Sequence, residues 1–188
     1  MYVLKKAEKV TKKEKIDGYD PANKAGGKDS DKCVCFVTEG LSAKTYVVAG
    51  IKEGVYGRKG RDWNGVLPVR GKLLNVRDKA ATVIAGNKVI CSLIHVLGLK
   101  HGVDYTCDEN FRKLNYGRLV VVADADVDGI HIEALILNFV HFLYPSLLQR
   151  PTPFVVSLKT PIVRVKLSRT KDRLFYDERR FKAWLSNQ

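Results

Sequence analysis

Long apolar runs and disulfide-forming cysteines are both missing from this sequence. No apolar run approaches the roughly 20 residues that a transmembrane helix requires, and the lysine-rich start MYVLKKAEKVTKKEK lacks the apolar stretch of a signal peptide. The four cysteines are too few and too scattered for a disulfide framework, and none forms the CxxC pair that would indicate zinc. They are Cys33, Cys35, Cys91 and Cys107. We therefore expect an intracellular protein that contacts no membrane and keeps its cysteines reduced.

Acidic residues are scarce relative to basic ones, and the imbalance is unevenly placed. The chain of 188 residues has 33 Lys and Arg against 20 Asp and Glu, a net charge of +13. Residues 1–32, 52–79 and 149–188 carry net charges of +3, +5 and +7, whereas the remainder sums to −2. An acidic centre among basic stretches suits a protein that grips a polyanion at its phosphates and acts on it through metal ions. A solvated basic surface is the alternative that composition leaves open.

With 45% apolar residues, the chain is long enough for one domain with a substantial core. Short apolar runs alternate along it with helical patterns. The expected strands lie at 33–38, 65–69, 118–123, 153–158 and 160–167. The expected helices lie at 42–51, toward the end of 74–99, at 131–144 and at 177–188. This order predicts an α/β domain with a mainly parallel central sheet flanked by helices.

Single residues and changes in composition refine this organisation. Ser42 is the expected N-cap of the first helix, and Pro68 indicates either an edge strand or the end of a strand. Residues 1–32 mix lysine, glycine and acidic residues with little apolar periodicity, so we expect a basic lead-in arm. The α/β domain is then expected at 33–167, and a C-terminal strand and helix extension at 168–188.

Three aspartates follow the apolar run RLVVVA at alternate positions. Asp124, Asp126 and Asp128 repel one another, so a positive group is expected among them. Glu39 follows the apolar run CVCFVT. Because ligands of open α/β sheets bind at the carboxyl ends of the strands, Glu39 would meet the aspartates there if the two strands are parallel neighbours. Such carboxylates can hold one or two hard cations, and Mg²⁺ is the natural candidate because it prefers oxygen ligands.

Other kinds of protein place aspartates in similar patterns. DADVDG matches the first half of a calcium-binding loop, but such a loop needs glutamate at its twelfth position, where this chain has Leu135. An aspartate at a strand end is also the nucleophile of phospho-acceptor and phosphatase domains. Neither pattern explains the basic stretches or Glu39. A solvated acidic turn without a function is the remaining alternative.

Several motifs occur in the order found in one protein family. They are ANKAGGKDSDKC, EGLSAK, PVRGKLLNVRDK, LNYGRL, VVVADADVDGIHIEALILNFVHFLYPSLL and TPIVRV. With them the chain resembles the TOPRIM domain of type IIA DNA topoisomerases from about Ala22 to Trp184, and the branch of eukaryotes and large DNA viruses resembles it most. The resemblance implies a Rossmann-like TOPRIM fold.

The same resemblance implies that the acidic residues form a magnesium site for DNA cleavage. Glu39 would be both a metal ligand and the general acid or base for the DNA 3′ oxygen. Asp124 would bridge two Mg²⁺ ions, Asp126 would hold the second, and Asp128 would support them. Mn²⁺ or Ca²⁺ is expected to be able to replace Mg²⁺.

The segment RGKLLN resembles the part of the family that contacts DNA near the point of cleavage. Lys72 and Asn75 would make these contacts, and Arg70 of the same segment is a further DNA-binding candidate. Lys72 could instead be a solvated loop charge, and Asn75 a helix cap. His131, next to the acidic residues, could contact DNA or a metal-bound water, or could form only local hydrogen bonds.

The resemblance implies one part of an ATP-dependent type II DNA topoisomerase, which cleaves and religates both strands. In that family the tyrosine nucleophile lies in a winged-helix domain after TOPRIM and the ATPase lies before it; neither is found in this sequence, which has no G-x-x-x-x-G-K-[ST] loop. We therefore expect duplex DNA and those domains as partners, a homodimeric full-length enzyme and an inactive isolated chain. The enzyme would be nuclear if eukaryotic, or located in the host cytoplasm, a virus factory or the virion if viral.

Two departures and two other functions stay open. Leu41 and Ile130 stand where the family usually has aspartate and serine, so the local support of the acidic site is expected to differ. A non-catalytic nucleic-acid-binding module with a structural cation would also carry basic stretches around an acidic centre. A primase or nuclease built on the TOPRIM fold is the second alternative.

Overall fold

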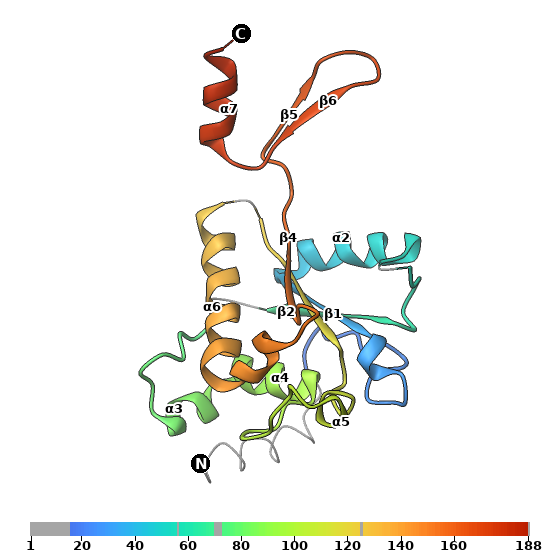
Figure 1. The fold of residues 1–188 in the computed structure, drawn as a ribbon, viewed down its shortest axis with the longest axis vertical. Helices are drawn as coiled ribbons and strands as arrows, with labels where there is room; N and C mark the ends of the chain where they lie inside the picture. The colour runs from blue at the N-terminus through green and yellow to red at the C-terminus, as the bar shows by residue number, and fades with distance from the viewer. Residues whose placement is uncertain (1–15, 56, 70–72, 125, 188) are drawn as a thin grey trace.

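The central sheet of the protein has four parallel strands (Figure 1). The computed structural model describes residues 16–55, 57–69, 73–124 and 126–187. The strand order is β2-β1-β3-β4. The strands are β1 (Val34–Glu39), β2 (Asn64–Val69), β3 (Arg118–Val122) and β4 (Val155–Leu158). The predicted parallel α/β sheet is confirmed. Pro68 lies in β2, an edge strand, where a residue without a backbone N–H is tolerated.

Helices cover both faces of this sheet. Helix α2 (Gly40–Glu53) packs on one face, and α4 (Lys88–Leu97) and α6 (Val127–Leu143) pack on the other. Alternate strand residues point to opposite faces, so Phe36 and Val120 pack with α2 while Val37 and Val121 join the larger core under α4 and α6. Short helices complete the connections: η2 (Ser30–Lys32), α3 (Ala81–Gly86), α5 (Asp108–Phe111) and η3 (Pro145–Gln149).

Two helices start earlier than expected. Helix α2 begins at Gly40 with Glu39 as its N-cap residue, so the predicted Ser42 cap is wrong. The chain can turn from β1 directly into the helix because Gly40 takes a left-handed conformation with φ of 74°. Helix α6 begins at Val127, ahead of the expected start at residue 131, with Asp126 as its N-cap.

The described part of the lead-in arm packs against the sheet edge. Asp20 forms an antiparallel bridge with Val66 of β2. Lys44 of α2 holds the same segment, since its Nζ atom lies 2.7 Å from an Asp20 carboxylate oxygen and 2.7 Å from the Gly18 carbonyl oxygen. The lysine of the EGLSAK motif therefore has a structural partner within the chain.

The C-terminal residues form a small unit beyond the sheet (Figure 1). Strands β5 (Val163–Lys166) and β6 (Asp172–Phe175) pair as an antiparallel hairpin, followed by α7 (Glu178–Leu185). Phe175 packs against Phe181 and Trp184 of α7, with ring centroids 5.3 and 5.4 Å away. The two strands lie on either side of residue 168, where the extension was expected to begin.

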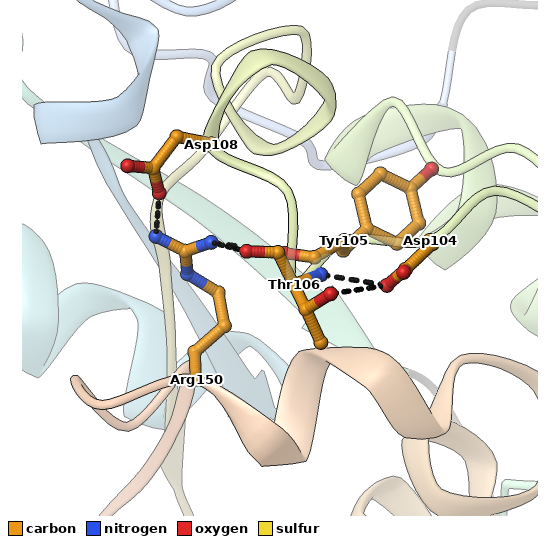
Figure 2. Close-up of polar contacts among 5 residues, drawn as sticks. All are labelled: Asp104, Tyr105, Thr106, Asp108 and Arg150. Atoms are coloured by element: carbon orange, nitrogen blue, oxygen red, sulfur yellow. Dashed lines mark hydrogen bonds and ion pairs between the residues drawn. The ribbon is translucent and has the colours of Figure 1, made fainter.

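Arg150 ties the loop before β3 to the segment after α6 (Figure 2). Its Nη1 atom donates to the carbonyl oxygens of Tyr105 and Thr106 at 2.9 and 3.1 Å, and its Nη2 atom donates to Asp108 at 2.6 Å. The guanidinium also lies over the Phe111 ring, 3.9 Å from the centroid. The hydrogen bond and charge of Arg150 lower the pKa of Asp108. The loop that leads into β3 is thereby held at several points.

No helix in the described ranges is both long enough and apolar enough to cross a membrane.

Candidate metal centre

Strand register places Glu39 and the aspartates at the same edge of the sheet. Strands β1 and β3 are parallel neighbours, and the last paired residues are Thr38 and Val122. Glu39 follows Thr38 directly, and Asp124 stands two residues after Val122. The structure therefore brings together the two acidic strand ends that the sequence analysis expected to meet.

Glu39 is held in an environment that disfavours its negative charge. Its Oε2 atom is shielded from solvent and has no hydrogen-bond partner among the residues that the structure describes. Burial, and then the charges of Asp126, Asp124 and Asp128, raises the pKa of Glu39. A cation beside this carboxylate would give Oε2 a partner and offset the repulsion.

The aspartates lie in the turn from β3 into α6. The Asp126 side chain accepts a hydrogen bond of 2.8 Å from the Gly129 backbone N–H and so caps the helix. Gly129 packs tightly on the preceding turn, because a Cβ atom there would lie 2.0 Å from the Asp124 carbonyl oxygen. Asp128 lies in the first turn of α6, where the positive end of the helix dipole favours acidic side chains. All three aspartates are exposed.

The donor set fits a hard divalent cation held in an open site. Every candidate ligand is a carboxylate, which suits Mg²⁺ and not zinc. Within the described ranges, no three His, Cys, Asp or Glu side chains gather closely enough to hold an ion by themselves. Mg²⁺ does not require such a cage, because it usually binds through one or two carboxylates, several waters and substrate phosphate.

The two DNA-binding candidates that the structure describes, Asn75 and His131, do not lie together beside the acidic residues. Arg70 and Lys72 lie outside the described residues. His131 is exposed on α6, just past its first turn. Asn75 contacts Asn138 of α6, which stands 12 residues after Asp126 and thus about 18 Å along the helix axis. The alternative that Asn75 caps a helix is wrong, since α3 begins only at residue 81 with Ala80 as its N-cap.

A small cavity beside Asp124 adds residues that the sequence analysis missed. It has a volume of about 70 Å³, and its lining includes Asp124, Ile130, Glu133, Lys159 and Tyr176. Lys159 follows β4, the parallel neighbour of β3, so it reaches the same edge of the sheet. Lys159 directly follows the apolar run VVSL, and the end of that run was the sequence signal that could have indicated this residue. Ile130 is exposed at this cavity, and the other departure, Leu41, is half exposed in the first turn of α2.

The fold and the acidic edge together define a Rossmann-like α/β domain with a carboxylate site at the carboxyl ends of its strands. No protein-family model matches the chain. The DNA topoisomerase 2 of Invertebrate iridescent virus 6 is 46% identical over 172 residues, which cover 86% of this chain and 15% of the viral protein. The DNA topoisomerase 2 of Pisum sativum is 40% identical over 183 residues, which cover 96% of this chain and 12% of that protein.

A solved structure supports the same relationship. The DNA-binding, cleavage and re-ligation domain of Plasmodium falciparum topoisomerase II matches with a TM-score of 0.77 and 34% identity, over 93% of this chain and 23% of that one. The chain is therefore a homologue of DNA topoisomerase 2 and has the TOPRIM fold found in a topoisomerase II cleavage domain, as its motifs predicted. It spans less than a sixth of the length of the two relatives named above.

Proposed function

We propose that this chain is the metal-binding TOPRIM part of an ATP-dependent type II DNA topoisomerase, in which a tyrosine outside the chain cleaves and religates duplex DNA. Glu39, Asp124 and Asp126 would hold Mg²⁺, with Asp128 in support. The observation that carries the proposal is the buried Oε2 atom of Glu39, which has no hydrogen-bond partner in the described structure. Burial and the charges of the neighbouring aspartates raise the pKa of the same carboxyl group. Homology to DNA topoisomerase 2 supplies the reaction.

Each acidic residue has a task that its local structure supports. Glu39 would exchange a proton with the DNA 3′ oxygen, and burial together with the neighbouring aspartates raises its pKa in the metal-free chain, which favours the protonated form. Asp126 is oriented by its bond to Gly129, and the backbone of Asp124 is confined by the same glycine. When bound, the metal would supply positive charge that stabilises the phosphate and the departing oxygen.

The rest of the proposal concerns DNA and the larger enzyme. Lys72, Arg70, Asn75 and His131 would contact the duplex, helped by the long-range attraction of the basic stretches for phosphate. The full-length enzyme would be a homodimer, with its ATPase and its tyrosine in other domains. The solved relative is named as a DNA-binding, cleavage and re-ligation domain, which supports this assignment.

The experiment is a magnesium titration of DNA cleavage and religation by the intact enzyme. Glu39→Gln keeps the size of the side chain and one oxygen donor but removes the titrating group, so rates should fall by the roughly 10²- to 10⁴-fold that acid and base catalysis contributes. Asp126→Asn should keep the helix cap and lose a charged ligand, so added Mg²⁺ should recover part of its activity.

Glu109→Gln is the matched control, because Glu109 is exposed on α5 and forms an ion pair with Lys113, four residues further along the chain. It should cleave DNA at the wild-type rate. Full recovery of Glu39→Gln at saturating Mg²⁺ would leave Glu39 as a ligand without an acid or base role. An intact enzyme that binds DNA but never cleaves it with Mg²⁺ would instead support the non-catalytic module.

A further inference from the structure

Two asparagines far apart in the sequence are joined by a short hydrogen bond. The Asn138 side-chain Nδ2 atom donates to the Oδ1 atom of Asn75 at 2.6 Å. The same Oδ1 atom accepts a second hydrogen bond, of 3.1 Å, from the Arg77 backbone N–H. Asn75 itself is exposed. The exposed amide thus has two donors that fix its oxygen atom.

These contacts determine which way the Asn75 amide faces. A backbone N–H can only donate, so the atom of Asn75 that faces Arg77 must be the carbonyl oxygen. Asn138 must then present its NH₂ group to that oxygen. Because both donors meet at Oδ1, the Asn75 NH₂ group is left to donate elsewhere, which is the chemistry that an acceptor such as a phosphate oxygen requires.

The surroundings hold both partners in place. Leu73 and Val76, on either side of Asn75, are 3% and 2% exposed in the larger core. Asn138 precedes Phe139 of α6, whose side chain is fully buried in the larger core. The backbone on each side of the contact is therefore anchored by apolar packing, while the amide orientation depends on the hydrogen bond.

We propose that Asn138 is a positioning residue that orients the Asn75 amide to donate to a DNA phosphate. The inference rests on the proposed function of Asn75 as a DNA contact. Asn138 needs no contact with DNA, since it acts through Asn75. Because Asp126 caps the helix that carries Asn138, one rigid element sets the spacing between the acidic edge and this phosphate contact.

The test is a double-mutant cycle on duplex affinity in the intact enzyme, with Asn75→Ala, Asn138→Leu and the double variant. Loss of the phosphate contact in Asn75→Ala should weaken affinity by about tenfold, the lower end expected for a hydrogen bond to a charged group. Asn138→Leu should weaken it by a few fold, and the double variant should be no weaker than Asn75→Ala alone. The cleavage rate at saturating DNA should stay at the wild-type value in Asn138→Leu, because the acidic end of α6 is unchanged.

Asn138→Asp gives a second variant of nearly the same shape and covers the case in which the larger apolar side chain of Asn138→Leu disturbs folding. A carboxylate cannot donate to Oδ1 and would draw the Asn75 NH₂ group toward itself, so the carbonyl oxygen would face the phosphate. Affinity should then fall at least as far as in Asn138→Leu. Asn187→Leu is the matched control, because this exposed asparagine donates only within the end of α7.

Each other outcome contradicts a different claim. If Asn75→Ala binds DNA normally, the proposed DNA contact of Asn75 is wrong, and the inference falls with it. If Asn75→Ala weakens binding but both Asn138 variants bind normally, only the positioning role is wrong. Losses that add in the double variant would show that Asn138 acts independently of Asn75 and would also overturn the inference.

Discussion

Helix α6 connects two polar regions that are built in opposite ways. Near the N-terminal end of α6, Glu39 of β1 carries an oxygen atom without a hydrogen-bond partner in the described structure, and burial and the aspartates raise the pKa of its carboxyl group. About 18 Å further along the helix axis, the Asn138 amide donates a neutral hydrogen bond to the Asn75 amide oxygen. In the proposed function a cation would complete the acidic region, whereas the asparagine contact is organised by the protein alone.

The two regions should also differ in what they contribute to stability. Like charges that lie close together oppose folding, so the removal of one of them should leave the fold intact or stabilise it. Hydrogen bonds that are satisfied within the chain stabilise it, and a buried or partly buried group that loses its partner is costly. Mutations in the two kinds of region should therefore change activity and stability in different proportions.

Among variants that remove only a metal ligand, the largest effect is expected for Asp124→Asn in the intact enzyme. Loss of one negative ligand should lower the rate of Mg²⁺-dependent DNA cleavage by about 10²- to 10³-fold, comparable to the loss of one electrostatic contact to a transition state. The melting temperature in EDTA should be unchanged or higher, because a repelling charge is gone. Asp177→Asn, at the N-cap of α7, makes the same chemical change at a distant helix and should cleave normally. A large loss of metal-free stability in Asp124→Asn would argue against a ligand role.

Arg150→Met should produce the largest change in stability. The carbonyl oxygens of Tyr105 and Thr106 would lose a donor that lies only 13% exposed, so the free energy of unfolding should fall by about 1 to 3 kcal/mol. For a chain of this size that corresponds to roughly 2 to 4 °C in melting temperature per kcal/mol. The comparison is with Arg169→Met, an exposed arginine between β5 and β6 that should melt like the wild type. Equal melting of the two variants would mean that the contacts of Arg150 drawn in Figure 2 add no stability.

Glu39→Gln should change how the stability of the metal-free chain depends on pH. A carboxyl group whose pKa is raised by folding stabilises the folded state when protonated, and that stabilisation is lost as pH rises from the ordinary value of about 4.3 through the raised folded pKa. Glu39→Gln removes this titration, so its unfolding free energy should fall less than that of the wild type over that range. Thermal unfolding in EDTA from pH 4 to pH 8 measures the difference. Mg²⁺ at neutral pH should then raise the melting temperature of the wild type more than that of Glu39→Gln. Parallel pH profiles would contradict the environment described for Glu39.

The smallest effect is expected for Leu41→Asp, which restores the residue that the TOPRIM family usually has. Leu41 is 50% exposed and stands two residues after Glu39, so an added carboxylate there should strengthen the acidic region without filling the core. The Mg²⁺ concentration for half-maximal cleavage should fall about two- to fivefold, as expected for up to roughly 1 kcal/mol of added attraction. Leu41→Asn introduces a side chain with the shape of aspartate but no charge, and it should leave this Mg²⁺ concentration unchanged. A higher magnesium requirement in Leu41→Asp would show that leucine suits this site better.

The parallel sheet and the meeting of the two acidic strand ends could be predicted because both depend on local patterns. Apolar runs such as CVCFVT and RLVVVA form strands, and their order with helices selects a parallel sheet whose carboxyl ends share one edge. The wrong Ser42 cap has a local cause as well: Gly40 allows the chain to turn into the helix two residues earlier than the capping residue suggested. The contact of Arg150 with Tyr105 carried no sequence signal, because nothing in a single sequence indicates which distant carbonyl an arginine will meet.

The sequence by itself determined the α/β class, the TOPRIM resemblance and the identity of the acidic residues, because apolar periodicity and motif order depend only on the order of residues in the chain. Only the tertiary structure decided that Glu39 has a shielded oxygen without a partner in its described surroundings, that Lys159 lines a cavity with Asp124, and that Asn138 holds the amide of Asn75. These facts depend on which side chains meet across elements that are separated by tens of residues. Three-dimensional packing determines which distant side chains come into contact. The local spacing of residues along the chain does not encode these contacts.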